Sequence, residues 1–299
     1  MTTDVLLVAN TDDEWPVGVT EMVGHRLSVA CVTVSEEPTS EIDCSSVRIL
    51  VGGPSNLAPW INRCPNLEWI QSTWAGVVVT PLKHVFGQSM SEFVFGWILA
   101  LERRILDRAR ASTWDDTPEM GVVGKTMGIL GTGSIGSAVA KTAQHFGIRC
   151  RGLNSTGRPV DGFEACFKAG DHRFFDDLDY VVSVLPKTTY TENVVDTNAL
   201  QRLRPGSVLI NIGRGNAIDD DALLAAINGG TVGATVLDVF REEPLPKSHP
   251  FWQQPNVYIT SHTSAPTLER FVAQAMAPNL ERFITGQDLA GTFDTSKGY

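Results

Sequence analysis

The chain has 299 residues, with 24 Lys and Arg against 34 Asp and Glu, and a formal net charge of −10 at pH 7. This length predicts two domains rather than one. Nucleic acids and anionic membranes are bound through clustered basic residues, so the acidic balance argues against both kinds of partner. A small anionic substrate is compatible with it, because one or two arginines in a cleft act locally.

The chain begins Met1-Thr2-Thr3-Asp4, with an acid where a secretory signal peptide has basic residues. Its most apolar stretch, Phe93 to Leu101, is far shorter than the roughly 20 residues that span a bilayer. We therefore expect a cytoplasmic protein. No pair of cysteines has the C-x-x-C spacing of a metal or redox site, so we expect no bound metal and five free thiols: Cys31, Cys44, Cys64, Cys150 and Cys166.

In chain order, short β-branched segments alternate with helical patterns, which predicts a parallel sheet flanked by helices. In the first part of the chain, strands are predicted over 5–9, 47–51 and 67–71. A long apolar helix over 90–110 follows. We interpret this helix as the link to a second α/β block.

The second block predicts six strands with short crossovers, the inventory of a dinucleotide-binding domain. The strands are expected over 126–130, 148–153, 180–184, 208–212, 234–237 and 257–260, and helices over 135–146, 197–203 and 219–228. An amphipathic helix over 267–284 comes last. We expect it to fold back on the first block, which makes that domain discontinuous.

A glycine-rich turn, Gly131-Thr132-Gly133-Ser134-Ile135-Gly136, follows the first strand of the second block. In G-x-G-x-x-G the first glycine allows the tight turn, the second lets a pyrophosphate approach the backbone, and the third allows close helix–strand packing. The next helix offers N–H groups and the positive end of its dipole to phosphates. Such turns also occur without a ligand, but a strand before and a helix after favour dinucleotide binding.

The end of the next strand should select the cofactor. An acid about 20 residues beyond the motif binds the ribose 2′-hydroxyl of NAD. This segment reads Asn154-Ser155-Thr156-Gly157-Arg158, and the first acid is Asp161. Hydroxyl groups and an arginine suit a 2′-phosphate, so we predict NADP(H) as the preferred cofactor and NAD(H) as possible. The alternative is an exposed turn with incidental polar residues.

Three later strand ends carry residues that suit the reduction of a 2-oxo acid: Arg214, Glu243 and His262. Arg214 can pair with the substrate carboxylate. His262 can supply the proton for the developing alkoxide, and Glu243 can orient its ring. Taken alone, each residue also has a non-catalytic interpretation: Arg214 as part of a surface ion pair, His262 as a hydrogen-bonded polar residue, and Glu243 as an acid in a loop. Their order after successive strands, at the edge where α/β sheets bind ligands, favours a catalytic set.

Together these motifs resemble those of the D-isomer-specific 2-hydroxyacid dehydrogenases. The resemblance implies an α/β fold with two Rossmann-like domains: a doubly wound dinucleotide-binding domain over 89–266, and a smaller, discontinuous, flavodoxin-like substrate-binding domain over 1–88 and 267–299. It implies an NAD(P)-dependent oxidoreductase that converts a 2-oxo acid into the D-2-hydroxy acid, acting as a homodimer. The segments that match are Gly131–Gly136, Leu185–Thr188 with Thr191, Asn211–Gly215, Leu237–Pro246 and His262.

The same resemblance extends the set of predicted site residues. Asp238 is expected to contact the nicotinamide carboxamide, and the loop Trp74-Ala75-Gly76-Val77 to bind the substrate carboxylate together with Arg214 and His262. Val78 stands where the family has Asp or Asn. The sequence of this loop is most similar to that of the corresponding loop in the glyoxylate/hydroxypyruvate reductases. The remaining predicted cofactor contacts are Gly131, Gly133, Ser134, Ile135, Gly136, Asn154, Ser155, Thr156, Arg158, Leu185, Pro186, Thr191, Ile212 and Gly213.

Two other functions stay open on the same scaffold. Relatives of this family act as NAD(H)-sensing corepressors, which bind a partner without turnover. Formate or phosphite oxidation on the same fold is a further alternative, because a fold does not fix the reaction. Turnover of a 2-oxo acid would separate the reductase from both.

Overall fold

The computed structural model describes residues 3–34, 43–73, 80, 85–119 and 121–292. The chain forms two compact units: unit 1 comprises Met1–Phe86 with Pro266–Tyr299, and unit 2 comprises Gly87–Ala265. Unit 1 ends at Phe86, two residues before the predicted boundary at 88, because the helix α3 that opens unit 2 already begins at Gly87. Unit 2 ends at Ala265, one residue before the predicted boundary at 266.

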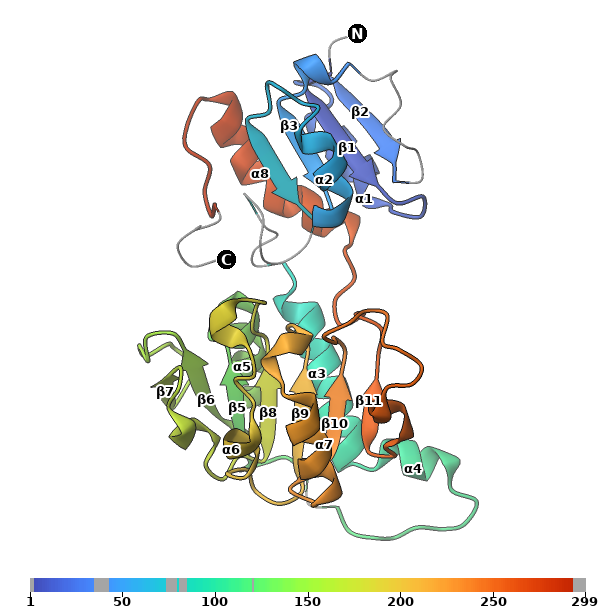
Figure 1. Cartoon of the computed structure of the whole chain (residues 1–299), viewed down its shortest axis with the longest axis vertical. Helices are drawn as coiled ribbons and strands as arrows, with labels where there is room; N and C mark the ends of the chain where they lie inside the picture. Colours follow the sequence, from blue (N-terminus) through green and yellow to red (C-terminus); the bar gives the residue numbers. More distant parts are fainter. Residues whose placement is uncertain (1–2, 35–42, 74–79, 81–84, 120, 293–299) are drawn as a thin grey trace. The chain divides into compact units, whose positions relative to one another are not determined.

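Unit 1 is built on a four-stranded parallel sheet in the order β2-β1-β3-β4. This is the start of the flavodoxin-like strand order. Helices α1 and α8 pack against each other, so the C-terminal helix is part of the same unit as the N-terminal strand (Figure 1). The elements are β1 (Val5–Ala9), α1 (Trp15–Val23), β2 (Val29–Thr33), β3 (Ile49–Gly52), α2 (Pro54–Ile61), β4 (Trp69–Ser72) and α8 (Glu269–Ile284).

Unit 2 is built on a seven-stranded parallel sheet in the order β11-β10-β9-β8-β5-β6-β7. Helices α6 and α7 lie on one face of it, and α3 and α5 on the other (Figure 1). The strand order reverses between β5 and β8, and ligands of such sheets bind at the carboxyl ends of the strands beside this point. The elements are α3 (Gly87–Glu102), α4 (Ile105–Arg110), β5 (Thr126–Leu130), α5 (Ser134–His145), β6 (Arg149–Asn154), β7 (Ala165–Lys168), β8 (Tyr180–Ser183), α6 (Thr197–Leu200), β9 (Ser207–Asn211), α7 (Asp220–Asn228), β10 (Val232–Leu237) and β11 (Val257–Ile259).

Two sequence predictions for unit 2 are wrong. The sheet has a seventh strand, β7, which pairs only with β6 at the edge and is partly exposed. Its apolar run, Ala165-Cys166-Phe167, is only three residues long, too short to indicate a strand from the sequence. The single helix predicted over 90–110 is two helices: α3 ends at Glu102, and Arg104 adopts a left-handed backbone with φ 48° directly before α4.

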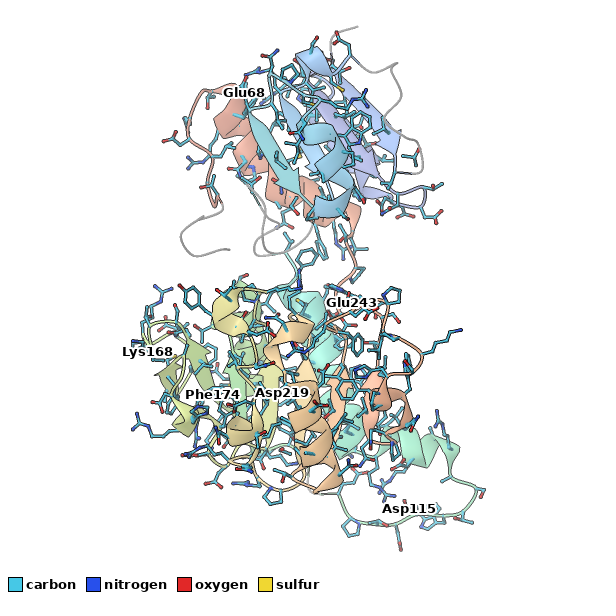
Figure 2. The ribbon with its side chains drawn as sticks, in the orientation of Figure 1. Glu68, Asp115, Lys168, Phe174, Asp219 and Glu243 are labelled. Carbon is cyan, nitrogen blue, oxygen red and sulfur yellow. The ribbon has the colours of Figure 1, made fainter. Side chains whose placement is uncertain are left out.

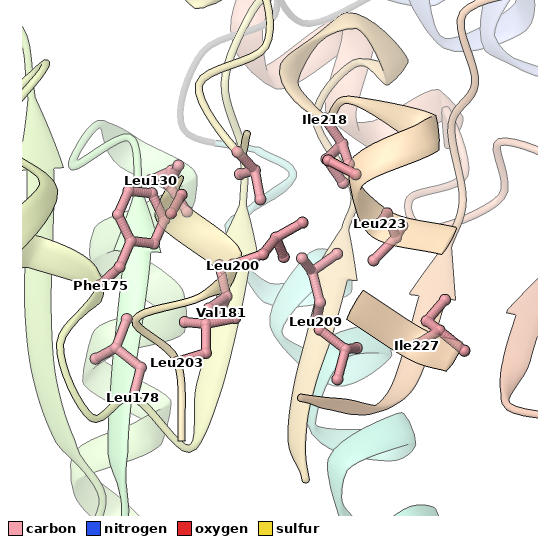
Figure 3. Packing of buried hydrophobic residues seen from close by; sticks show 14 of the residues in the cluster. Leu130, Phe175, Leu178, Val181, Leu200, Leu203, Leu209, Ile218, Leu223 and Ile227 are labelled. Carbon is pink, nitrogen blue, oxygen red and sulfur yellow. The ribbon is translucent and has the colours of Figure 1, made fainter. Parts of the chain in front are cut away.

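One hydrophobic core cluster of unit 2 lies between the sheet and the helices α6 and α7. Figure 3 shows Val181 and Leu209 from the strands packed with Leu200 and Leu223 from the helices. This packing fixes the ends of β8, β9 and β10, where the predicted site residues stand. In the part of the chain that the structure describes, no helix is long and apolar enough to cross a membrane.

The cysteines differ in exposure, which predicts an order of reaction with a thiol reagent. Cys31 is exposed, whereas Cys64 and Cys150 are buried, and burial raises the pKa of each of these two thiols to about 12. Because the thiolate is the nucleophile, both should stay unreacted near pH 8. We expect iodoacetamide to label Cys31 in the native protein and Cys150 only after unfolding, as read by peptide mass spectrometry. Rapid native labelling of Cys150 would contradict the buried placement.

Candidate functional site

The glycine-rich turn lies between β5 and α5 and has the geometry that a dinucleotide requires. Gly131 has φ 101°, which favours glycine, and a Cβ on Gly136 would lie 1.9 Å from the Gly131 carbonyl oxygen. A Cβ on Gly133 would meet nothing within 4 Å. Gly133 also precedes the first turn of α5 without a capping side chain. Open space above the second glycine and an uncapped helix start, with Ser134 and Ile135 in its first turn, fit a pyrophosphate.

The turn after β6 is shaped by Asn154. Its Oδ1 accepts the N–H groups of Thr156 at 3.2 Å and Gly157 at 2.7 Å, and its Nδ2 donates to the Arg158 carbonyl at 3.0 Å. Asn154 therefore stabilises the turn, and Ser155, Thr156 and Arg158 are exposed on it. No carboxylate follows the strand within this turn, which fits a 2′-phosphate better than a 2′-hydroxyl.

The sequence reasoning missed a lysine beside this turn. Lys168, at the end of β7, lies opposite Asn154 in the strand register. A Cβ on Gly157 would come within 3.1 Å of its backbone nitrogen. Lys168 is exposed at the edge of unit 2 (Figure 2). It was missed because its strand was missed; assigning Ala165–Lys168 as an edge strand would have revealed it.

The loops after β8 and β9 contact each other. Thr191 Oγ1 donates to the Pro186 carbonyl at 2.7 Å and holds the first loop. A Cβ on Gly213 would lie 2.6 Å from the Leu185 nitrogen, so only glycine allows the second loop to come this close. Ile212 is buried, and any contact it makes with a cofactor would be through its backbone.

Arg214 follows β9 in a turn that Asn211 stabilises. Asn211 Nδ2 donates to the Arg214 carbonyl at 3.0 Å, and the Gly213 N–H donates to Asn211 Oδ1 at 3.1 Å. Burial of the guanidinium lowers the pKa of Arg214, and the charge of Glu243 opposes that shift. A partly desolvated cation interacts strongly with an anion, so this position suits a carboxylate.

Glu243 and His262 form a pair. His262 Nδ1 lies 2.8 Å from Glu243 Oε2, and the Phe240 N–H donates to the other oxygen, Glu243 Oε1, at 2.9 Å. Their side chains are 36% and 39% exposed, so a small molecule can reach both. Figure 2 shows Glu243 at the edge of unit 2 where its strands end. The structure thus brings together two of the three predicted catalytic residues in hydrogen-bonding geometry.

Asp238 has a structural task that the sequence did not indicate. Its buried carboxylate accepts the Thr260 hydroxyl at 2.5 Å and the N–H groups of Thr263 at 2.8 Å and Ser264 at 2.9 Å. Its carbonyl accepts the His262 N–H at 2.8 Å. His262 has φ 57°, which is uncommon for a non-glycine residue and is found at functional sites. Asp238 therefore holds the turn that presents His262, and its nicotinamide contact stays a prediction.

The predicted substrate loop, Trp74–Val77, lies outside the residues that the structure describes.

A cavity that was not predicted lies in unit 2, with a volume of about 220 Å³. Its lining includes Leu153 from the end of β6 and Tyr190 and Asn193 from the loop after β8. Within the described residues, no group of three or more His, Cys, Asp or Glu side chains is arranged to hold a metal ion.

The fold and this edge of the sheet define a nucleotide-binding α/β oxidoreductase. Residues 95–264 match the model of the D-isomer specific 2-hydroxyacid dehydrogenase NAD binding domain. A glyoxylate/hydroxypyruvate reductase A from Serratia proteamaculans is 33% identical over 231 residues, which cover 75% of this chain and 74% of that protein. The chain therefore belongs to the D-isomer specific 2-hydroxyacid dehydrogenase family of NAD(P)-dependent oxidoreductases.

Solved structures agree over the whole length. A family member from Aeromonas salmonicida is 35% identical, has a TM-score of 0.86, and is matched over 98% of this chain and 99% of its own. A D-isomer specific 2-hydroxyacid dehydrogenase from Xanthobacter autotrophicus Py2, in complex with NADPH and MES, has a TM-score of 0.88 at 26% identity, with 99% and 100% coverage. The predicted fold class, a two-domain α/β fold with parallel sheets, is confirmed.

Proposed function

We propose that the protein is an NADPH-linked reductase of small 2-oxo acids, with glyoxylate or hydroxypyruvate as the leading substrate class and the D-2-hydroxy acid as product. The observation that carries this proposal is the 2.8 Å contact between His262 Nδ1 and Glu243 Oε2 beside the half-buried cation Arg214. This arrangement pairs a proton donor with an anion-binding group. The names of the relatives support the substrate class.

In the proposed mechanism, the cofactor bound over the Gly131–Gly136 turn supplies a hydride to the carbonyl carbon. Arg214 binds the carboxylate of the 2-oxo acid and holds its carbonyl in one orientation. His262 donates a proton from Nε2 to the carbonyl oxygen as negative charge develops there. Glu243 keeps Nδ1 engaged, which fixes the ring orientation and stabilises the imidazolium before transfer. The Trp74–Val77 backbone is a further expected carboxylate contact.

A panel assay tests the proposal directly. The absorbance of the reduced nicotinamide is followed with glyoxylate, hydroxypyruvate, pyruvate and bulkier 2-oxo acids, with NADPH and NADH in parallel. We expect turnover with at least one small 2-oxo acid and a higher kcat/KM with NADPH. Absence of turnover with every acid, while the cofactor still binds, would favour the corepressor-like alternative. Oxidation of formate or phosphite, without reduction of a 2-oxo acid, would favour a formate- or phosphite-type dehydrogenase.

If the turn after β6 selects NADPH, replacing its arginine should affect the KM for NADPH and not that for NADH. Arg158→Ala should raise the KM for NADPH by about 10-fold or more, the worth of one charge-assisted hydrogen bond to a phosphate, and leave the KM for NADH nearly unchanged. Lys168→Ala is the companion variant, since its backbone lies beside the same turn. Steady-state kinetics with both cofactors measure the effect. Equal losses with NADPH and NADH would remove the 2′-phosphate role of Arg158.

The dimeric state and the product configuration rest on family membership. Sedimentation would test the first, and chiral analysis of the product the second. A monomer with full activity would end the dimer proposal without affecting the catalytic assignment.

A further inference from the structure

Arg241 lies two residues before Glu243, and its guanidinium contacts several acceptors from other parts of unit 2. Its guanidinium donates to Glu192 Oε1 at 2.6 Å, and Asp220 Oδ2 lies 3.7 Å from its Nε. It also donates to the side chain of Asn193 and to the backbone carbonyls of Asn216, at 3.4 Å, and Ile218. The side chain is only 34% exposed. Its partners are thus fixed acceptors on other segments of unit 2.

These partners stand beside two other groups of predicted site residues. Glu192 and Asn193 directly follow Thr191, in the loop after β8. Asn216 and Ile218 follow Arg214 within four residues, in the segment after β9. Arg241 itself belongs to the loop after β10. One side chain therefore connects the loops of three neighbouring strands.

Two of these loops pack directly against each other at Arg241. A Cβ on Gly215 would lie 2.0 Å from the Phe240 carbonyl carbon and 2.3 Å from the Arg241 nitrogen, so the two backbones touch. The cavity lined by Gly215 and Phe240 has a volume of about 10 Å³, which holds at most one water. The Phe240 N–H is also the donor that fixes Glu243 Oε1. The position of the Glu243 carboxylate therefore depends on the backbone at residues 240–241.

The positive charge of Arg241 also affects the pKa values of two carboxylates beside it, Glu192 and Asp220. The hydrogen bond from Arg241 lowers the pKa of Glu192. Burial raises the pKa of Asp220, and the nearby Arg241 and His249 oppose that shift. Loss of the guanidinium would leave a partly buried carboxylate and backbone carbonyls without their donor, a cost that the loops can relieve only by moving.

We propose that Arg241 is a positioning residue, which holds Glu243 against His262 and in register with Arg214 by linking the loops after β8, β9 and β10. This proposal rests on the proposed function, since it assumes that the His262–Glu243 pair serves proton transfer. Arginine suits the task because its planar guanidinium reaches several acceptors at once, whereas lysine offers a point charge. Arg241 itself is not assigned a contact with the reacting atoms.

The test is a double-mutant cycle on kcat with the best 2-oxo acid substrate of the wild-type enzyme. Arg241→Met should lower kcat by about 10- to 100-fold, the cost of a catalytic group displaced by an ångström or less. In a Glu243→Gln background the same change should have little further effect, because Arg241 acts through Glu243. Arg241→Lys should recover only a small part of the loss. Glu192→Gln, which weakens one contact, should give a smaller loss in the same direction.

Arg202→Met is the matched control, since it removes one exposed ion pair, Arg202–Asp176 at 2.8 Å, outside these loops. Its kcat should equal that of wild type. Additive losses from Arg241→Met and Glu243→Gln, or wild-type kcat in Arg241→Met, would overturn the proposal. If Arg241→Met does not fold, wild-type kcat in both Arg241→Lys and Glu192→Gln would overturn it too. A wild-type enzyme without turnover would count against the proposed function instead, so the two failures are distinguishable.

Discussion

Replacing His262 by asparagine or alanine is expected to lower kcat by about 10²- to 10⁴-fold, the usual contribution of a positioned general acid. Both variants remove the imidazole whose Nδ1 lies 2.8 Å from Glu243 Oε2. With the imidazole gone, the proton for the developing alkoxide must come from water. In the proposed mechanism the imidazole acts only as charge develops on the carbonyl oxygen, so the loss should appear in kcat rather than in substrate binding.

Asparagine is the more informative of the two substitutions. His262 has φ 57°, and asparagine tolerates this left-handed backbone better than alanine does. His262→Asn should therefore keep the turn that Asp238 holds, and its Tm should stay close to that of the wild type. The measurements are steady-state kcat, the Kd for NADPH by fluorescence quenching, and Tm. Unchanged kcat in His262→Asn, with normal cofactor binding, would mean that another residue supplies the proton.

Several strands were predictable because their signals are local. The strands β1 and β5 begin and end at the predicted residues, since each is a buried apolar run followed by a change of composition. The glycine motif likewise needs only its own six residues and the flanking strand and helix. Residue type and position after each strand were sufficient to select Arg214, Glu243 and His262 as candidates.

Features that depend on distant residues were not predictable. The break at Arg104 has no Gly or Pro to announce it; Arg103 and Arg108 both pair with Glu119, which lies later in the chain. The network of Arg241 joins residues up to 49 positions apart. Periodicity and short motifs carry no information on such pairings. Asp238 is a related case, because the hydroxyl and the two backbone N–H groups that donate to its carboxylate lie on a segment more than 20 residues away.

Arg214 carries the second large prediction. Arg214→Met should lower kcat/KM for the 2-oxo acid by about 10²-fold or more, because two charge-assisted hydrogen bonds to a carboxylate are each worth about 1.5–3 kcal/mol. Arg214→Lys keeps a positive charge but lacks the planar pair of donors, so its kcat/KM should lie between those of wild type and Arg214→Met. The KM for NADPH should change little in both.

Stability separates this binding role from a structural one. Burial lowers the pKa of Arg214, which means that the folded protein holds this cation in an environment that disfavours its charge. At neutral pH Arg214 is nevertheless charged, so the folded state bears a desolvation cost that a methionine of similar length does not have. Arg214→Met should therefore keep or raise Tm while kcat/KM falls, the pattern of a group retained for its ligand. A marked drop in Tm with kcat/KM near wild type would instead assign Arg214 to the fold, and the carboxylate of the substrate would need another partner.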